Sequence, residues 1–148
     1  MAGRDVIKRF ARLGLVRQML AIEAVLTLGV AAAAIAFTPY RWAVKLGSRP
    51  LARSERPWPD GKVDEIIWSV KAAAARVPWR AMCFERGLAL QWMLRRRGFD
   101  AKLVYGARMK EASELDAHVW VTLGSRTLIG GEQAGEYRSL ATHPEWSR

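Results

Sequence analysis

The hydrophobic pattern of residues 1–58 is helical. Residues 1–17 space apolar side chains three to four positions apart among five arginine and lysine residues, which predicts a basic amphipathic helix. Residues 19–37 are almost entirely apolar and predict a long second helix. Residues 49–61 are polar and rich in proline, so we expect a linker there. This pattern divides the chain into an N-terminal helical region and a second domain, residues 59–148.

Two further helices are predicted in the middle of the chain. Residues 62–76 carry apolar side chains at the i, i+3, i+4 and i+7 spacing of one helix face, with Asp60 as the expected N-terminal cap. The next helix begins at Cys83 and is apolar on nearly all its faces, which is typical of a central, buried helix. Three arginines in its last turn and Gly98 after them are expected to end it. We therefore expect the Cys83 thiol at the positive end of a buried helix.

Three short apolar segments predict strands: 101–107, 117–123 and 126–129. Gly124 and Ser125 begin a tight turn, so the last two strands should form an antiparallel hairpin. The charged segment 110–116 and the polar tail 134–148 are expected to be loops. The expected order is therefore helices followed by short strands, with the cysteine at the start of a buried helix and the histidine on a strand.

The composition limits the classes of function. A chain of 148 residues, half of them hydrophobic, suits one domain with a short appendage. One cysteine excludes an internal disulfide, and with two histidines it argues against a zinc site, so we expect no metal, no cofactor and a reducing, cytoplasmic setting. The net charge of +10 is concentrated in the first 58 residues, where ten basic residues stand against three acidic ones. No zinc-finger spacing or recognition helix accompanies that charge, which argues against nucleic-acid binding.

The apolar segment 19–37 allows two interpretations. Its length suits a membrane span, and basic residues flank it on both sides. Glu23 within it would be costly in lipid, and the run 31–34 is only weakly hydrophobic. We therefore favour a peripheral or partner-docked helix over a membrane anchor, with peripheral membrane contact through residues 6–37 as one form of docking.

Cys83 and His118 are the candidate catalytic pair. A thiol is a useful nucleophile only as the thiolate, which the positive end of a helix favours. His118 lies 35 residues further on, within a predicted strand, and could serve as the base. Taken alone, Cys83 would be a small buried apolar residue and His118 a core histidine. Their joint order, a cysteine at a helix start and then a histidine on a strand, favours the catalytic interpretation.

The hairpin register suggests a third catalytic residue. If the loop has three residues, 124–126, then Glu132 lies opposite His118 and is the best candidate to hold the imidazole from behind. A two-residue loop places a neighbour of Glu132 opposite instead, and Gln133 could orient the ring as a neutral amide. Asp116 lies two positions before the histidine on the same strand face, so it is a further candidate.

The motifs around these residues resemble a known family. They run from the segment before the cysteine to the end of the hairpin: Pro78-Trp79-Arg80-Ala81-x-Cys83, Leu88-Ala89-Leu90-x-x-x-Leu94-Arg95-Arg96-Arg97-Gly98, Ala101-x-Leu103-x-x-Gly106, Ala117-His118-x-Trp120-Val121 and Leu128-Ile129-Gly130-Gly131. Together they resemble the lasso-peptide maturation B protein, and more narrowly its transglutaminase-like leader-peptidase half, in the form that lacks a fused leader-binding domain. The resemblance covers residues 60–142, although the Ala-His-x-Trp piece alone is shared by the wider transglutaminase-like superfamily.

This resemblance implies a papain-like or transglutaminase-like α+β fold and a cysteine peptidase that removes the leader from a ribosomally made precursor. Cys83 would be the nucleophile and His118 the base. The family's third residue is an acid, usually Asp, on the strand after the histidine, whereas this chain has Glu132 after two glycines. The implied partners are the precursor peptide, a separate small leader-binding protein and an ATP-dependent lasso cyclase.

Three side chains beside the catalytic motifs are candidate substrate-binding residues: Trp79, Arg80 and Trp120. The alternative function is a non-catalytic module of the same fold that recruits a precursor or a membrane. Transfer of the acyl group to an amine, as in protein crosslinking, is a third hypothesis, and only the resemblance favours hydrolysis over it.

Overall fold

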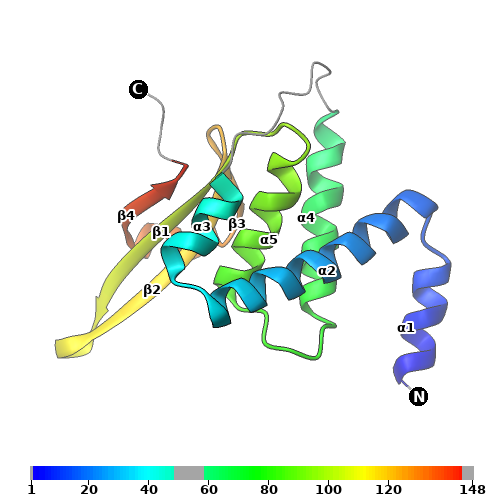
Figure 1. The fold of residues 1–148 in the computed structure, drawn as a ribbon, viewed down its shortest axis with the longest axis horizontal. Helices are drawn as coiled ribbons and strands as arrows, with labels where there is room; N and C mark the ends of the chain where they lie inside the picture. The colour runs from blue at the N-terminus through cyan, green and yellow to red at the C-terminus, as the bar shows by residue number, and fades with distance from the viewer. Residues whose placement is uncertain (1, 49–58, 145–148) are drawn as a thin grey trace.

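The computed structural model describes residues 2–48 and 59–144, which form an α+β fold (Figure 1). Its helices are α1 (Ala2–Ala11), α2 (Leu15–Phe37), α3 (Tyr40–Ser48), α4 (Asp60–Ala74) and α5 (Cys83–Arg95). Its strands are β1 (Ala101–Lys110), β2 (Glu114–Leu123), β3 (Arg126–Ile129) and β4 (Arg138–His143). Two short 3₁₀ helices are η1 (Glu111–Ser113) and η2 (Ala134–Glu136). The predicted fold class is confirmed, and the antiparallel strands have the spatial order β3-β2-β1-β4.

The middle helices begin close to where the pattern places them. α5 begins at Cys83 as predicted, and Gly98 follows it with a φ of +83°, a conformation that favours glycine. α4 begins at Asp60, so the prediction of Asp60 as the cap is wrong, and Pro59 occupies the cap position. The reason is that the Pro59 carbonyl already accepts a hydrogen bond from the Lys62 N–H (2.8 Å). The predicted linker and the domain boundary fall largely on residues 49–58, which lie outside the described residues.

β1 and β2 form the long central hairpin of the sheet. Their pairing runs from Ala101 opposite Leu123 to the tip of the hairpin, and it places Gly106 opposite His118. Both strands are longer than predicted, because the charged segment expected as a loop contains only the single turn of η1 between them. The extra pairs fix the position of β2, and with it the position of the histidine.

β4 corrects the prediction that the tail is loop-like. It pairs antiparallel with β1, from Ala107 opposite Arg138 to Leu103 opposite His143. β4 is an edge strand with exposed residues in its first half, and such a strand needs few apolar side chains. The sequence of β4 therefore lacks the alternation that reveals a half-buried strand.

α5 lies between the sheet and the helices α2 and α4 (Figure 1). Most of its residues are buried, as its pattern predicts, and they form one hydrophobic core with buried side chains of α2, α3, α4 and the sheet. Gly87 permits the close approach of α5 to the sheet, since a Cβ there would lie 2.9 Å from Leu103 Cδ1 and 3.0 Å from Val119 Cγ1. This packing places the start of α5 near the middle of β2.

α2 packs one face on α4 and α5, while α1 extends away from the rest of the fold (Figure 1). The Glu23 carboxylate of α2 pairs with Arg96 (2.8 Å) and Arg97 (2.5 Å), which directly follow α5. By length and composition alone, α2 could also cross a membrane. The mean hydropathy of its most apolar 18 residues is 2.2, and 28% of those residues are buried.

Candidate active site

Cys83 is the first residue of α5, and local contacts fix it there. The Glu85 carboxylate accepts a hydrogen bond from the Met82 N–H (2.9 Å), which sets the start of the helix just before the cysteine. Arg86 Nε donates to the Ala81 carbonyl (2.7 Å) and ties the preceding segment to the first turn. Cys83 is a free, half-buried thiol. It is therefore held at the positive end of α5 with part of its surface accessible.

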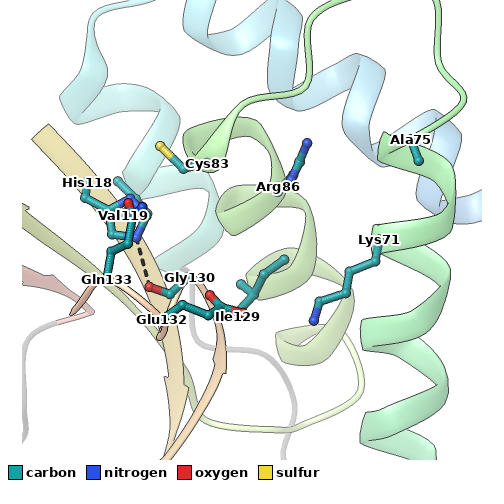
Figure 2. A pocket seen from close by; sticks show the side chains of 10 residues that line it. All are labelled: Lys71, Ala75, Cys83, Arg86, His118, Val119, Ile129, Gly130, Glu132 and Gln133. Carbon is teal, nitrogen blue, oxygen red and sulfur yellow. Dashed lines mark hydrogen bonds between the residues drawn. The ribbon is translucent and has the colours of Figure 1, made fainter. Parts of the chain in front are cut away.

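A pocket of about 440 Å³ adjoins Cys83 (Figure 2). It is lined by residues of α4, α5, β2 and the end of the β3 hairpin: Lys71, Ala75, Cys83, Arg86, His118, Val119, Ile129, Gly130, Glu132 and Gln133. Figure 2 shows the Cys83 sulfur and the His118 ring on the same side of this pocket. The structure thus brings the predicted nucleophile, the predicted base and Glu132 to one site, together with Gln133.

His118 is held by one hydrogen bond and two aromatic rings. Its Nε2 lies 2.8 Å from the Gly130 carbonyl oxygen. The rings of Trp120 and Tyr137 have their centroids 6.1 Å and 5.0 Å from the imidazole centroid. Because a carbonyl oxygen only accepts hydrogen bonds, Nε2 carries the proton of the neutral ring and Nδ1 keeps the lone pair. The imidazole is therefore oriented with Nδ1 as its basic atom.

Gly130 is a site residue that sequence reasoning missed. Its φ is +75°, and a Cβ at this position would lie 2.7 Å from the Val119 carbonyl oxygen and 3.2 Å from His118 Nε2. Glycine is thus required both by the backbone conformation and by the close approach to β2. The signal in the sequence is the Gly130-Gly131 pair directly after a strand, which indicates a close backbone approach.

The hairpin register explains why a main-chain oxygen lies behind the imidazole. The turn has two residues, 124–125, which is the alternative to the three-residue loop considered above. A bulge then shifts the register and brings Val121 opposite Ile129, where β3 ends. No β3 residue pairs with His118, and Glu132 lies beyond the strand with an exposed side chain that lines the pocket. A role for Glu132 as the third catalytic residue stays a prediction.

Asp116 binds two neighbours other than the imidazole. Its carboxylate accepts hydrogen bonds from the Tyr137 hydroxyl (2.8 Å) and from Arg108 Nε (3.1 Å). The Tyr137 hydrogen bond, followed by Arg108, lowers the pKa of Asp116, and the same hydrogen bond raises the pKa of Tyr137. Arg108 also lies over the Tyr137 ring, 4.7 Å from its centroid. Asp116 therefore holds the ring that packs on His118. Tyr137 itself was missed because it lies in the tail predicted as a loop.

The three predicted substrate-binding residues do not line this pocket. Trp120 is buried, and its ring lies against Gly106, where a Cβ would be 2.7 Å from the indole. Trp79 lies against Gly29 of α2, and Arg80 is exposed. Their role in substrate binding stays a prediction. For Trp120, the structure shows a packing position beside the histidine.

Two basic side chains give the pocket a positive wall. Lys71 of α4 and Arg86 of α5 line it, while Glu132 is the one acid among the lining residues. Sequence reasoning missed both cations, because an exposed basic residue on a helix carries no signal until the helices are placed in space.

The reactive groups of the pocket are one thiol and one imidazole, the pair used for nucleophilic acyl transfer. In the described parts of the chain, residues 2–48 and 59–144, no three His, Cys, Asp or Glu side chains are grouped so as to hold a metal ion.

Comparison with known proteins places the chain in a family. The family model described as the transglutaminase-like superfamily matches residues 24–142, from α2 to β4. No curated protein and no solved structure matches the chain. The family match covers the cysteine-bearing helix, the whole sheet and most of the chain. The protein therefore belongs to the transglutaminase-like superfamily.

Proposed function

We propose that this protein is a cysteine peptidase that removes the leader from a ribosomally made lasso-peptide precursor. The observation that carries the catalytic part is the meeting of Cys83, at the start of α5, and His118, on β2, at one open pocket. A thiol at the positive end of a helix, beside an oriented imidazole, is an arrangement that activates a cysteine nucleophile. The transglutaminase-like fold is also one that cysteine peptidases use.

In the acylation step, Nδ1 of His118 takes the proton of the Cys83 thiol. The thiolate attacks the carbonyl carbon of the leader–core peptide bond, and the carbonyl oxygen becomes an oxyanion. Main-chain N–H groups in the first turn of α5 have no acceptor within the helix, so they can hold this oxyanion at about 3 kcal/mol per donor. The C–N bond then breaks, the imidazolium gives its proton to the leaving amine, and the leader remains attached as a thioester.

In the deacylation step, His118 removes a proton from a water molecule that attacks the thioester carbonyl. The thiolate leaves and is reprotonated, so Cys83 and His118 return to their starting state. The products are a leader with a free carboxylate and a core peptide with a new α-amine. Glu132 would stabilise the imidazolium by its charge from the wall of the pocket, while the Gly130 carbonyl orients the ring.

The motif run from Pro78 to Gly131 supports a lasso-peptide leader as the substrate. In this proposal, a separate small leader-binding protein presents the precursor to the pocket. An ATP-dependent cyclase then joins the freed amine to an acidic side chain of the core. Trp79 and Arg80, next to the nucleophile in sequence, would contact the leader outside the pocket.

The test is cleavage of a precursor by the purified chain together with the leader-binding protein, followed by mass spectrometry. Cys83→Ala should abolish cleavage and leave Tm nearly unchanged, because a half-buried thiol contributes at most about 1 kcal/mol to stability. Cleavage at the wild-type rate after this substitution would contradict the peptidase proposal. A wild-type protein that binds the precursor without cleaving it would favour the non-catalytic recruiting module.

Alkylation gives an independent test of the thiol. The chain has one cysteine, so a single mass addition by iodoacetamide reports on Cys83 alone. Fast addition at neutral pH, slowed by His118→Ala, is expected for an activated thiol. Slow addition, equal in both proteins, would indicate an inert thiol.

A further inference from the structure

α2 carries an apolar face that no described part of the chain covers. Large side chains recur along it every three or four positions, except that Ala33 fills one of these positions. Each large side chain is more than half exposed: Leu15, Met19, Ile22, Leu26, Val30 and Phe37. We name this set the outer stripe. The helix has 23 residues, so the stripe is about 34 Å long. Monomeric soluble proteins rarely expose an apolar surface of this extent without a use for it.

The opposite face of α2 is built differently. It is buried in the hydrophobic core and consists mostly of small residues: Leu20, Ala24, Thr27, Leu28, Ala31 and Ala34. The ion pairs of Glu23 with Arg96 and Arg97 fix the helix to the end of α5. Because this face of the helix belongs to the core of the domain, the outer stripe is the face that is available to a partner. This arrangement suits a helix that lies on a surface and does not suit one that crosses a bilayer.

Basic residues adjoin both ends of the outer stripe. Before it come Lys8 and Arg9 of α1 and Arg12, which lies between α1 and α2. After it comes α3, where Arg41 and Lys45 lie beside the exposed Trp42 and Leu46. Figure 1 shows α1 extending beyond the N-terminal end of α2, away from the rest of the fold. A long apolar face with cations at both ends matches the acyl boundary and phosphate headgroups of an anionic bilayer.

We propose that the outer stripe of α2 binds peripherally to an anionic phospholipid surface. Lys8 and Arg9 of α1 and Arg12 after it would contact the headgroups, and the exposed apolar side chains of α2 would enter the boundary between headgroups and acyl chains. This inference goes beyond the proposed peptidase function and does not depend on it, because it rests on a different surface of the molecule.

The test is flotation of the purified full chain with vesicles. The two compositions are phosphatidylcholine alone and phosphatidylcholine mixed with phosphatidylglycerol. The chain should float with the anionic vesicles, bind the neutral ones more weakly and be released by added salt. Changing Ile22, Leu26 and Val30 to Ser together should lower vesicle affinity about 10-fold or more. Changing Lys8, Arg9 and Arg12 to Gln should lower binding to the anionic vesicles by a similar factor.

A matched control removes exposed apolar surface elsewhere. Met109, Leu115 and Leu140 lie on the sheet and are also more than half exposed, so changing all three to Ser should leave vesicle binding unchanged. Unchanged far-UV circular dichroism and Tm would show that each variant is folded, and Leu26→Ser alone serves if the triple variant unfolds. The proposal is overturned if the chain floats with no vesicle, if the stripe variant binds like the wild type, or if sodium carbonate fails to extract the bound chain. The last outcome would mean insertion across the bilayer.

Discussion

The imidazole of His118 is oriented by the backbone. Its Nε2 donates to the carbonyl of Gly130, so the orienting group is neither ionisable nor part of a side chain. A carboxylate in this place would both orient the ring and stabilise its charge. Here the main chain orients the ring, while Glu132, at the pocket wall, is only the proposed source of a stabilising charge.

Gly130→Ala adds only one methyl group, but we expect it to lower kcat because it disturbs the carbonyl that orients the imidazole. The new Cβ would lie 2.7 Å from the Val119 carbonyl and close to Nε2, at a φ of +75°. We expect a loss of about 1–3 kcal/mol in stability and at least a 10-fold fall in kcat, measured by urea unfolding and precursor cleavage. Gly124→Ala is the matched control, since Gly124 also has a positive φ (+57°) but nothing within 4 Å of its Cβ position. It should lose stability and keep kcat. Equal losses of kcat in both variants would remove the special role of Gly130.

Glu132→Gln tests the proposed electrostatic role of the carboxylate at the pocket wall. Its side chain is exposed, so its interaction with the imidazolium should be worth about 1 kcal/mol and kcat should fall about 5-fold. Stability should not change. A fall in kcat as large as that of His118→Ala would instead make Glu132 an indispensable third member, and no fall at all would remove it from the mechanism.

The distance between α5 and the sheet affects how far the Cys83 thiol lies from the His118 imidazole, because Cys83 begins α5 and His118 lies on β2. Gly87 faces Leu103 and Val119, and Val119 directly follows His118 in β2. Gly87→Ala places a methyl group within 3.0 Å of both side chains, so α5 or the sheet has to move. We expect about 1–3 kcal/mol of destabilisation and a lower kcat, measured by thermal unfolding and precursor cleavage.

Gly29→Ala is the control for this substitution. It lies in α2, and its new Cβ would meet only Trp79 at 3.6 Å, which is an ordinary contact. Alanine has the higher helix propensity, so stability should rise by about 0.5–1 kcal/mol with no change in kcat. A stabilising effect of Gly87→Ala would show that α5 is not packed tightly on the sheet.

The elements that the sequence predicts well are those whose own pattern decides their structure. α5 is apolar all round and has a glycine at its end, and the β2–β3 hairpin has clear apolar segments around a glycine turn. β4 was missed because an edge strand exposes half of its residues. After the bulge the hairpin has the register that puts position 132 opposite His118, but β3 ends at Ile129, and the spacing of residues along the chain does not encode that end. Cys83 and His118 could therefore be named from the sequence, but the oxygen that holds the imidazole could not.

At the scale of the whole molecule, α2 joins the N-terminal residues to α4 and α5. Half of the buried residues on its core face are alanine, which gives a weak hydrophobic signal in the sequence but allows close helix packing. The exposed side chains of the outer stripe dominate its hydropathy. For this reason the sequence alone could not separate a docked helix from a membrane span.

The ion pairs of Glu23 make this attachment dependent on pH. The hydrogen bond from Arg97, as the largest cause, lowers the pKa of Glu23 below its ordinary value of 4.5, despite the opposing effect of burial. The folded state therefore favours the carboxylate, and its contribution to stability is fully present above the unfolded pKa. That contribution is lost as the pH falls through the lower, folded pKa.

Glu23→Gln should consequently be less stable than the wild type by about 1 kcal/mol at neutral pH, since the pair is partly exposed. The difference should shrink toward zero below about pH 4, measured by urea unfolding across the pH range. Asp64→Asn is the control, because its pair with Arg126 is more than half exposed on both sides and should contribute little at any pH. An attachment that depends on charge has to weaken when the Glu23 carboxylate is protonated. If the stability difference between Glu23→Gln and the wild type instead stays constant from neutral to acid pH, α2 is held by packing alone.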